Sequence, residues 1–205
     1  MNKIVLTYFD IDGGRGESIR LALNIGGMDF EDDRFPFSKF PALLEKLPLR
    51  QVPVLMLNDR QITQSNAILR YIGKQADLYP VDDLRALLCD EILEAIEDVT
   101  DKLVATFGLS GDEFKAARQE LVAGPLTLYL QWLEAKLTQE GGDYFVENRL
   151  SIADLKVFVW TRALSSGVMD HIPTDLVQNL APKLHRHQQF IAALEPISQY
   201  YAQRG

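Results

Sequence analysis

The sequence is poor in the residues that build disulfides and metal sites. Cys89 is the single cysteine of the 205 residues and cannot form a disulfide within the chain. The three histidines, His171, His185 and His187, have no metal-ligand spacing, and the last two would point in different directions on a helix. The sequence therefore predicts neither an internal disulfide nor a bound metal.

The chain also lacks a basic surface and a long apolar run. Its net charge is -8 and its pI is near 4.9, whereas nucleic acid or an anionic membrane requires a basic face on its partner. No apolar run approaches the length of a membrane span, and the N-terminal residues are too few and too weakly basic for a signal peptide. We therefore expect a cytoplasmic protein that binds neither nucleic acid nor a membrane.

Apolar residues make up 47% of the chain, enough to bury a core without crosslinks. In the first part of the sequence, short β-type and helical segments alternate. Strands are predicted at 4–9, 30–35, 52–57 and through Ile62, and helices at 17–25, 42–46 and 66–75, the last capped by Ser65. The order is βαβ, then α, then ββα, and the final hairpin makes the sheet mixed.

Beyond turn and acidic residues at 76–83, the pattern becomes helical. Long helices are predicted over 84–107 and 113–137, and Gly124-Pro125 should kink or split the second one. One more helix is expected after Pro182.

The predicted fold is thus α/β plus all-α. A βαβ-α-ββα domain covers residues 1–77, a linker covers about 78–83, and an all-helical domain covers 84–205.

Four short motifs stand out in this organisation. They are Tyr8 with Arg15 in the first loop, Val52-Pro53 before the third strand, Gln64-Ser65 at a helix start, and a Ser151-to-Asp154 capping box. Together, in this order and at about this spacing, they resemble the cytosolic glutathione transferases, most closely the sigma-like branch. The resemblance implies a thioredoxin-like glutathione-binding domain, an all-helical second domain, glutathione as co-substrate, no metal, and a homodimer.

The resemblance assigns a catalytic role to two of these residues. Tyr8 would donate its hydroxyl hydrogen to the glutathione sulfur and stabilise the thiolate, and Arg15 would add a positive charge nearby. Lowering a thiol pKa from about 8.5 by about two units requires about 2.7 kcal/mol, which a hydrogen bond to a charged acceptor can supply. Without the resemblance, Tyr8 is interpreted as a half-buried strand residue and Arg15 as one end of a local salt bridge.

The resemblance also implies how glutathione is held. The backbone before Pro53, in a cis peptide bond with Val52, would pair with the cysteinyl backbone of glutathione. Gln64 and Ser65, at the start of a helix, would hold the γ-glutamyl carboxylate.

Three positions bear on the glycyl end of glutathione. Phe40 stands where sigma-like proteins usually have a tryptophan, and Leu44 where many have a lysine. Neither can hydrogen-bond the glycyl carboxylate, whereas Gln51 can. We therefore expect glutathione binding with a weakened glycyl end. The loop from Tyr8 to Arg15 is also one residue longer than the related pattern.

Further site residues follow from the same resemblance. Asp101 would reach the glutathione amino group across the dimer, with Asp98 as its competitor. The hydrophobic substrate would be lined by Phe9, Ile11, Phe107, Lys156 and Trp160. Phe107 and Trp160 are equally compatible with core positions of amphipathic helices.

Three functions are compatible with these features. The first is conjugation of glutathione to hydrophobic electrophiles; the second is a glutathione-dependent isomerisation like that of prostaglandin synthases; the third is a non-catalytic binding or structural module. Retention of Tyr8, Arg15 and the pair Gln64-Ser65 favours an enzyme. Thiol-disulfide exchange would need a cysteine where Tyr8 and Phe9 stand.

Overall fold

The computed structural model describes residues 3–204, which form two compact units. One unit comprises the chain up to Tyr79 together with the segment from Glu195 onward, and the other comprises Pro80–Leu194. The C-terminal segment therefore belongs to the first unit, although it lies within the helical domain predicted over 84–205. Within the described residues, no helix combines the length and the apolar character needed to cross a membrane.

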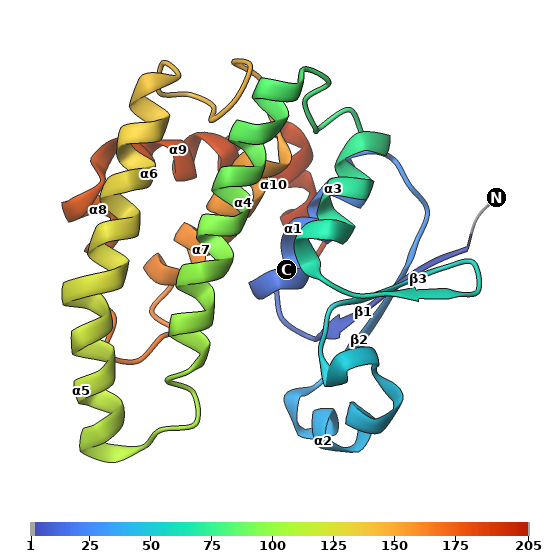
Figure 1. The fold of residues 1–205 in the computed structure, drawn as a ribbon, viewed down its shortest axis with the longest axis horizontal. Coiled ribbons are helices and arrows are strands. Elements are labelled where there is room, and N and C mark those ends of the chain that lie inside the picture. The colour runs from blue at the N-terminus through green and yellow to red at the C-terminus, as the bar shows by residue number, and fades with distance from the viewer. Residues whose placement is uncertain (1–2, 205) are drawn as a thin grey trace. The chain divides into compact units, whose positions relative to one another are not determined.

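The first unit is built on a four-stranded sheet of order β2-β1-β3-β4 (Figure 1). Its strands are β1 (Ile4–Phe9), β2 (Glu31–Phe35), β3 (Val54–Leu57) and β4 (Arg60–Ile62). β1 pairs in parallel with β2 and antiparallel with β3, and β3 forms a hairpin with β4. The mixed sheet is thus as predicted, and its centre is the fully buried pair Leu6 and Leu55, which lie opposite one another.

The helices of the first unit are α1 (Gly14–Ile25), α2 (Phe40–Leu43), α3 (Ser65–Gln75) and α10 (Glu195–Ala202), with single 3-10 turns η1 (Phe37–Lys39), η2 (Leu44–Lys46) and η3 (Pro48–Arg50) around α2. α1 packs against both α3 and α10. The core between these helices includes the buried side chains of Ile19, Leu23, Ile68 and Ile72. The sheet with α1, α2 and α3 is the thioredoxin-like arrangement that the resemblance implies, and α10 is a further helix of this unit.

Two helix starts differ from the sequence-based expectation. α1 begins at Gly14, not at Glu17, because the two loop glycines lead directly into its first turn. Ser65 is the first residue of α3 and not its cap, because Gln64 takes the cap position with a φ of 73°.

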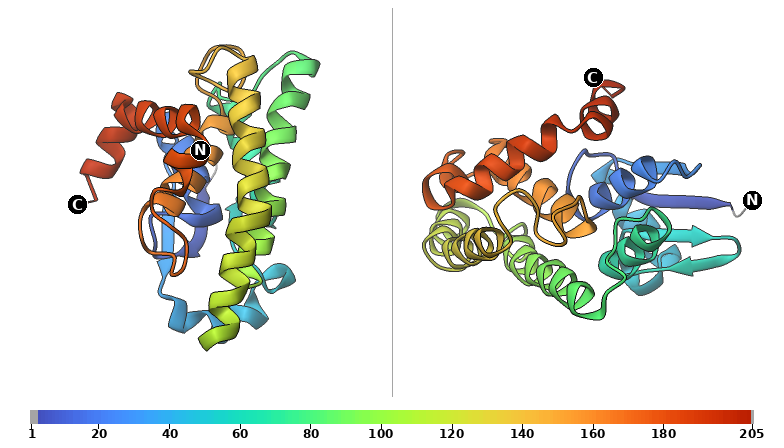
Figure 2. Two further views of the ribbon diagram at one scale, coloured as in Figure 1. Left: turned by 90° about the vertical axis from the view of Figure 1, so that its left-hand side faces the viewer. Right: turned by 90° about the horizontal axis from the view of Figure 1, so that it is seen from above.

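The second unit consists of α4 (Asp83–Val104), α5 (Gly111–Leu121), the π-helical turn η4 (Val122–Leu126), α6 (Thr127–Gln139), α7 (Ile152–Ser165), α8 (Leu176–Leu180) and α9 (Pro182–Ala193). α4 lies beside the long run formed by α5, η4 and α6, and α7 packs against α4 and α9 (Figures 1 and 2). Every residue of α7 from Ile152 to Thr161 is buried. α7 is therefore the central helix of this unit.

The predicted break at Gly124-Pro125 is a local change of helix type. Pro125 lies inside the π-helical turn, and the Thr127 hydroxyl donates to the Val122 carbonyl oxygen at 2.7 Å. The turn accommodates the missing proline N–H without separating α5 from α6.

The predicted capping box is present and extends further than the sequence indicates. Asp154 is fully buried and accepts hydrogen bonds from the Ser151 amide at 2.8 Å and the Ser151 hydroxyl at 2.7 Å. It also accepts from the Phe145 amide at 2.9 Å and contacts His187 Nε2 of α9 at 3.0 Å. This carboxylate therefore joins the start of α7 to α9.

A single helix was expected after Pro182, but an extended Leu194 (ψ 133°) separates α9 from α10.

Candidate functional site

Tyr8 lies near the end of β1 and is only 6% exposed. Its Oη accepts a hydrogen bond of 2.9 Å from the backbone N–H of Arg15, in the first turn of α1. The helix N-terminus, where amide hydrogens point outward, therefore faces the tyrosine oxygen. Because Oη is the acceptor of this bond, the hydroxyl hydrogen of Tyr8 points elsewhere.

The ring of Tyr8 is held between two glycines. A Cβ added at Gly14 would come within 2.5 Å of Oη, and one added at Gly16 within 2.5 Å of Cγ. Gly14 also has a φ of +66°, which glycine adopts without steric cost. On the ring itself, the Arg20 guanidinium lies 5.6 Å from the centroid. None of these three residues, Gly14, Gly16 and Arg20, was predicted at the site, although glycines in the first turn of a helix are a signal because they weaken it.

Arg20 fixes the backbone that follows Tyr8. Its fully buried guanidinium donates to the carbonyl oxygens of Ile11 at 2.9 Å and Phe9 at 3.1 Å. It also donates to Asp32 at 2.8 Å and Glu17 at 3.2 Å. A buried guanidinium with four acceptors is well compensated for its loss of water. Arg20 thus ties the β1–α1 loop to both α1 and β2.

Two carboxylates beside Arg20 respond to their surroundings in opposite ways. Burial raises the pKa of Glu17 above its usual range, although Arg20 and Arg204 work against the shift. Burial also disfavours ionised Asp32, but hydrogen bonds from Arg34 and Arg20 outweigh it and lower its pKa.

An aromatic cluster follows β1. The Phe9 ring stacks on Phe37 with centroids 4.4 Å apart, and contacts Phe35 at 5.2 Å and Phe40 at 5.1 Å. Phe9, predicted to line the substrate site, and Phe40, predicted near glutathione, therefore contact each other. Phe37 is 59% exposed and forms the outer side of the cluster.

The strand register brings the predicted glutathione-binding motifs to one end of the sheet. The Val52–Pro53 peptide bond is cis, and Pro53 directly precedes β3. Thr7 lies opposite Val54, so the next step along β1 and β3 places Tyr8 beside Pro53. Leu55 lies opposite Ile62, and continuing that register places Gln64 on the other side of Pro53.

Gln51 and Ser65, two residues predicted to bind glutathione, differ in the exposure of their side chains. Gln51 is exposed before the cis bond, and Ser65 is 6% exposed in the first turn of α3. The first unit thus offers a backbone edge, a helix N-terminus and a tyrosine hydroxyl at the same end of its sheet.

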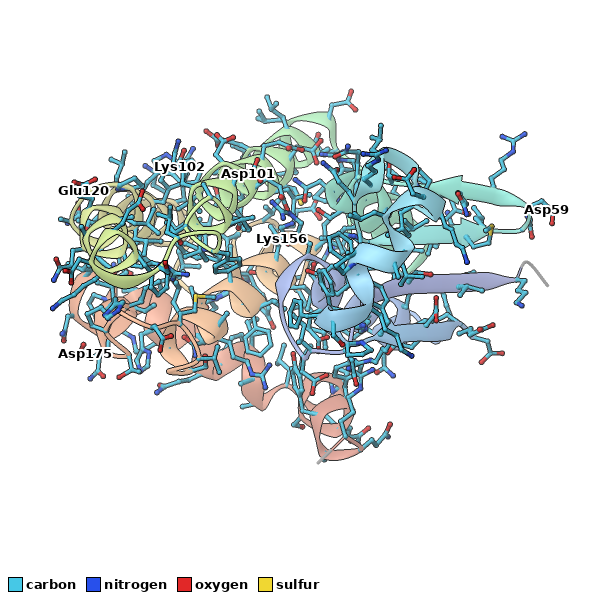
Figure 3. The ribbon with its side chains drawn as sticks, turned by 90° about the horizontal axis from the view of Figure 1, so that it is seen from below. Asp59, Asp101, Lys102, Glu120, Lys156 and Asp175 are labelled. Carbon is cyan, nitrogen blue, oxygen red and sulfur yellow. The ribbon has the colours of Figure 1, made fainter. Side chains whose placement is uncertain are left out.

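The remaining predicted residues lie in the second unit. Asp101 is exposed on α4 (Figure 3). Its competitor Asp98 is exposed on the same helix. Lys156 of α7 is only 4% exposed, and its Nζ donates to Glu97 of α4. Its ammonium group is therefore already paired within this unit.

The two aromatic residues of the second unit have opposite environments. Trp160 is 6% exposed, and its buried Nε1 has no hydrogen-bond partner among the described residues. Phe107 follows the end of α4, is 60% exposed, and lies 5.2 Å from the Arg118 guanidinium. Between residues 3 and 204, no group of three or more His, Cys, Asp or Glu side chains is arranged to hold a metal ion.

Both parts of the chain match models of one protein family. Residues 4–74 match the family model of the glutathione S-transferase N-terminal domain, and residues 97–204 match that of the C-terminal domain. Glutathione S-transferase 1 of Ascaris suum is 29% identical over 209 residues, covering 100% of this chain and 98% of its relative.

Two solved structures extend the likeness to the fold. The glutathione S-transferase from Ascaris lumbricoides is 30% identical, covers 99% of this chain and 98% of its own, and superposes with a TM-score of 0.83. The structure of prostaglandin synthase D of Nilaparvata lugens is 25% identical, with coverage of 99% and 98% and a TM-score of 0.86. The chain belongs to the glutathione S-transferase family and is a glutathione transferase.

Proposed function

We propose that the first unit binds glutathione beside Tyr8 and that the Tyr8 hydroxyl stabilises its thiolate for attack on hydrophobic electrophiles. The observation that carries this proposal is the hydrogen bond from the Arg15 amide to Tyr8 Oη. A hydroxyl that accepts a hydrogen bond becomes a better donor, because the two bonds polarise each other. In this proposal the hydroxyl donates its hydrogen to the sulfur of bound glutathione, which is a strong nucleophile as a thiolate.

The required energy is of the size that this arrangement can provide. A thiol has a pKa of about 8.5, and lowering it by about two units takes about 2.7 kcal/mol. A hydrogen bond to a charged acceptor contributes roughly 1.5–3 kcal/mol. In this proposal, the Arg15 side chain adds a positive charge near the sulfur and contributes in the same direction.

The other contacts of glutathione follow from the end of the sheet where Tyr8 lies. The Val52 backbone next to the cis bond would pair with the cysteinyl part, and Gln64 with Ser65 would receive the γ-glutamyl carboxylate at the α3 N-terminus. Gln51 would serve the glycyl carboxylate. Phe40 packs on Phe9, so its contribution there is apolar.

We also propose a cytoplasmic homodimer in which Asp101 of one subunit serves the glutathione of the other, with Asp98 as the alternative. Phe107, Lys156 and Trp160 remain proposed substrate contacts, together with Phe9 and Ile11. Among them Lys156 would act through its aliphatic stem, because its ammonium group is paired with Glu97.

A second candidate reaction is the isomerisation of a prostanoid-like substrate with glutathione as cofactor. It is supported by the likeness to the prostaglandin synthase D of Nilaparvata lugens. Both reactions would start from the same thiolate. Activity measured with an aromatic halide and with a prostanoid-like substrate therefore separates them.

The test of the mechanism compares Tyr8→Phe with the matched variant Tyr71→Phe, which changes an exposed tyrosine on α3. We expect Tyr8→Phe to lower kcat/KM for conjugation to an aromatic halide about 25-fold at neutral pH, because a rise of the thiol pKa from about 6.5 to about 8.5 lowers the thiolate fraction at pH 7 by about that factor. Tyr71→Phe should leave it unchanged. Equal activities in the two variants would exclude Tyr8 as the group that stabilises the thiolate, and a native protein that does not bind glutathione would overturn the whole proposal.

A further inference from the structure

The loop that joins Tyr8 to Arg15 contains two adjacent glycines. A Cβ added at Gly13 would meet no described heavy atom within 4 Å, and Gly14 has a φ of +66°. Such a segment has more backbone freedom than any other dipeptide and fixes little by itself. Yet the Arg15 amide at its end must stay within hydrogen-bond distance of Tyr8 Oη. Something outside the glycines has to hold this loop.

Arg20 holds the first part of the loop through the carbonyl oxygens of Phe9 and Ile11, and Asp12, which directly precedes the two glycines, is a further point where the loop is held from outside. Its Oδ1 accepts from Arg34 of β2 at 3.0 Å and from Arg204 at 3.1 Å. Arg34 also donates to Asp10 at 3.3 Å and to Asp32 at 2.7 Å. Asp12 is therefore bridged by two guanidinium groups, one from the sheet and one from the C-terminal end of the chain.

Arg204 is itself held from several sides. Its Nη2 donates to Asp32 at 3.0 Å, its Nη1 lies 3.8 Å from Glu17, and its guanidinium lies 4.1 Å from the centroid of the Tyr200 ring. The side chain is 23% exposed. Because α10 packs against α1, the C-terminal segment presents this guanidinium to the loop at the N-terminal end of α1. A planar guanidinium can bridge two carboxylates at once, whereas an ammonium group acts as a point charge.

We propose that Arg204 is a positioning residue. By bridging Asp12 and Asp32, it holds the β1–α1 loop so that the Arg15 amide keeps its hydrogen bond to Tyr8 Oη. This inference rests on the proposed function of Tyr8. Single exposed ion pairs contribute little, but bridged pairs in a network hold geometry more firmly. In this arrangement, the last residues of the chain control the acidity of glutathione bound at the first strand.

The inference is tested with Arg204→Gln, Arg204→Lys and the control Arg60→Gln, which changes an exposed arginine on β4. The thiolate of bound glutathione is followed by its ultraviolet absorbance as a function of pH, alongside kcat and KM and the melting temperature. We expect Arg204→Gln to lower the thiolate fraction at neutral pH, and with it kcat/KM, about three- to tenfold. Arg204→Lys should recover part of this loss, and Arg60→Gln should behave as the native protein.

A double variant tests the route. If Arg204 acts through Asp12, then Asp12→Asn combined with Arg204→Gln should lower the thiolate fraction no more than Asp12→Asn alone. An Arg204→Gln protein with a lower melting temperature but an unchanged thiol titration would overturn the inference, because its role would then be structural. Tyr8→Phe separates the two proposals. If the thiol pKa of bound glutathione shifts with Tyr8→Phe but not with Arg204→Gln, only the positioning role of Arg204 is rejected. If it does not shift with Tyr8→Phe, the proposed function of Tyr8 is rejected as well.

Discussion

Replacement of Gly16 by alanine should impair catalysis without touching a polar group. The added Cβ would lie within 2.5 Å of Cγ and 3.0 Å of Cβ of Tyr8, whereas ordinary contacts begin at 3.4 Å. Restoring 3.4 Å requires the ring to move by about 1 Å relative to α1. Such a displacement separates Tyr8 Oη from the Arg15 amide, which is now 2.9 Å away.

The magnitude follows from two opposing terms. Alanine favours a helix over glycine by about 1 kcal/mol, so local propensity alone predicts a more stable protein. Overpacking of a filled site costs about 1–3 kcal/mol, and the Tyr8 ring is buried and cannot swing into solvent. We therefore expect a net loss of stability of up to about 2 kcal/mol, and a loss in kcat/KM of up to about 25-fold, the value expected for removing the hydroxyl altogether.

The matched control is Gly13→Ala, three residues earlier in the same glycine-rich segment. No described heavy atom lies within 4 Å of its added Cβ, and its φ of -176° is open to any residue. Glutathione conjugation and urea denaturation are measured for both variants. If Gly16→Ala conjugates glutathione within a fewfold of Gly13→Ala, the close packing of Gly16 on Tyr8 does not position the hydroxyl, and the reasoning is refuted.

Three further predictions concern stability. The raised pKa of Glu17 means that the folded protein holds the carboxyl proton more tightly than the unfolded chain does. Its contribution to the free energy of unfolding is therefore fully present below the unfolded pKa of about 4.3 and is lost as pH rises through the folded pKa. Glu17→Gln should remove this loss of stability with rising pH in a series of urea titrations, and parallel pH profiles of the two proteins would contradict it. Asp154→Ala should lower the free energy of unfolding by about 3–5 kcal/mol, because it leaves the buried amides of Ser151 and Phe145 without an acceptor. Ser151→Ala keeps the hydrogen bond from the backbone amide of residue 151 to Asp154 and should lower the free energy of unfolding by about 1 kcal/mol. A loss equal to that of Asp154→Ala would show that the hydroxyl dominates the capping box.

The sheet and most helices could be predicted because their signals are local. Alternating and periodic apolar residues marked β1 and α4, and the Asn58-Asp59 turn marked the hairpin. Tyr8 near the end of the first strand and Pro53 at the head of the third could be predicted in the same way, whereas their position beside one another follows from the strand register of the folded sheet.

Arg20 and Lys156 could not be placed in the same way. Sequence patterns treat both as surface residues, because isolated cations are rarely buried. Arg20 becomes a core residue through the carbonyl oxygens of Phe9 and Ile11, and Lys156 through Glu97, which is 59 residues away. These partners are brought together by the fold, so the burial of the cations is a tertiary property that no local pattern contains.

The first turn of α1 combines two choices that local helix physics disfavours. Arg15 places a positive charge at the positive end of the helix dipole, at a cost of about 0.3–1 kcal/mol, and Gly16 replaces a better helix former at about 1 kcal/mol. The same helix is otherwise buried and well packed from Gly16 to Leu23. Natural sequences depart from local rules mainly where function requires it. The backbone amide of Arg15 donates to Tyr8 Oη, and the absent side chain of Gly16 leaves room for the Tyr8 ring. The conflict at Gly16 between helix propensity and the space that the Tyr8 ring needs therefore points to the same residue as the proposed glutathione chemistry does.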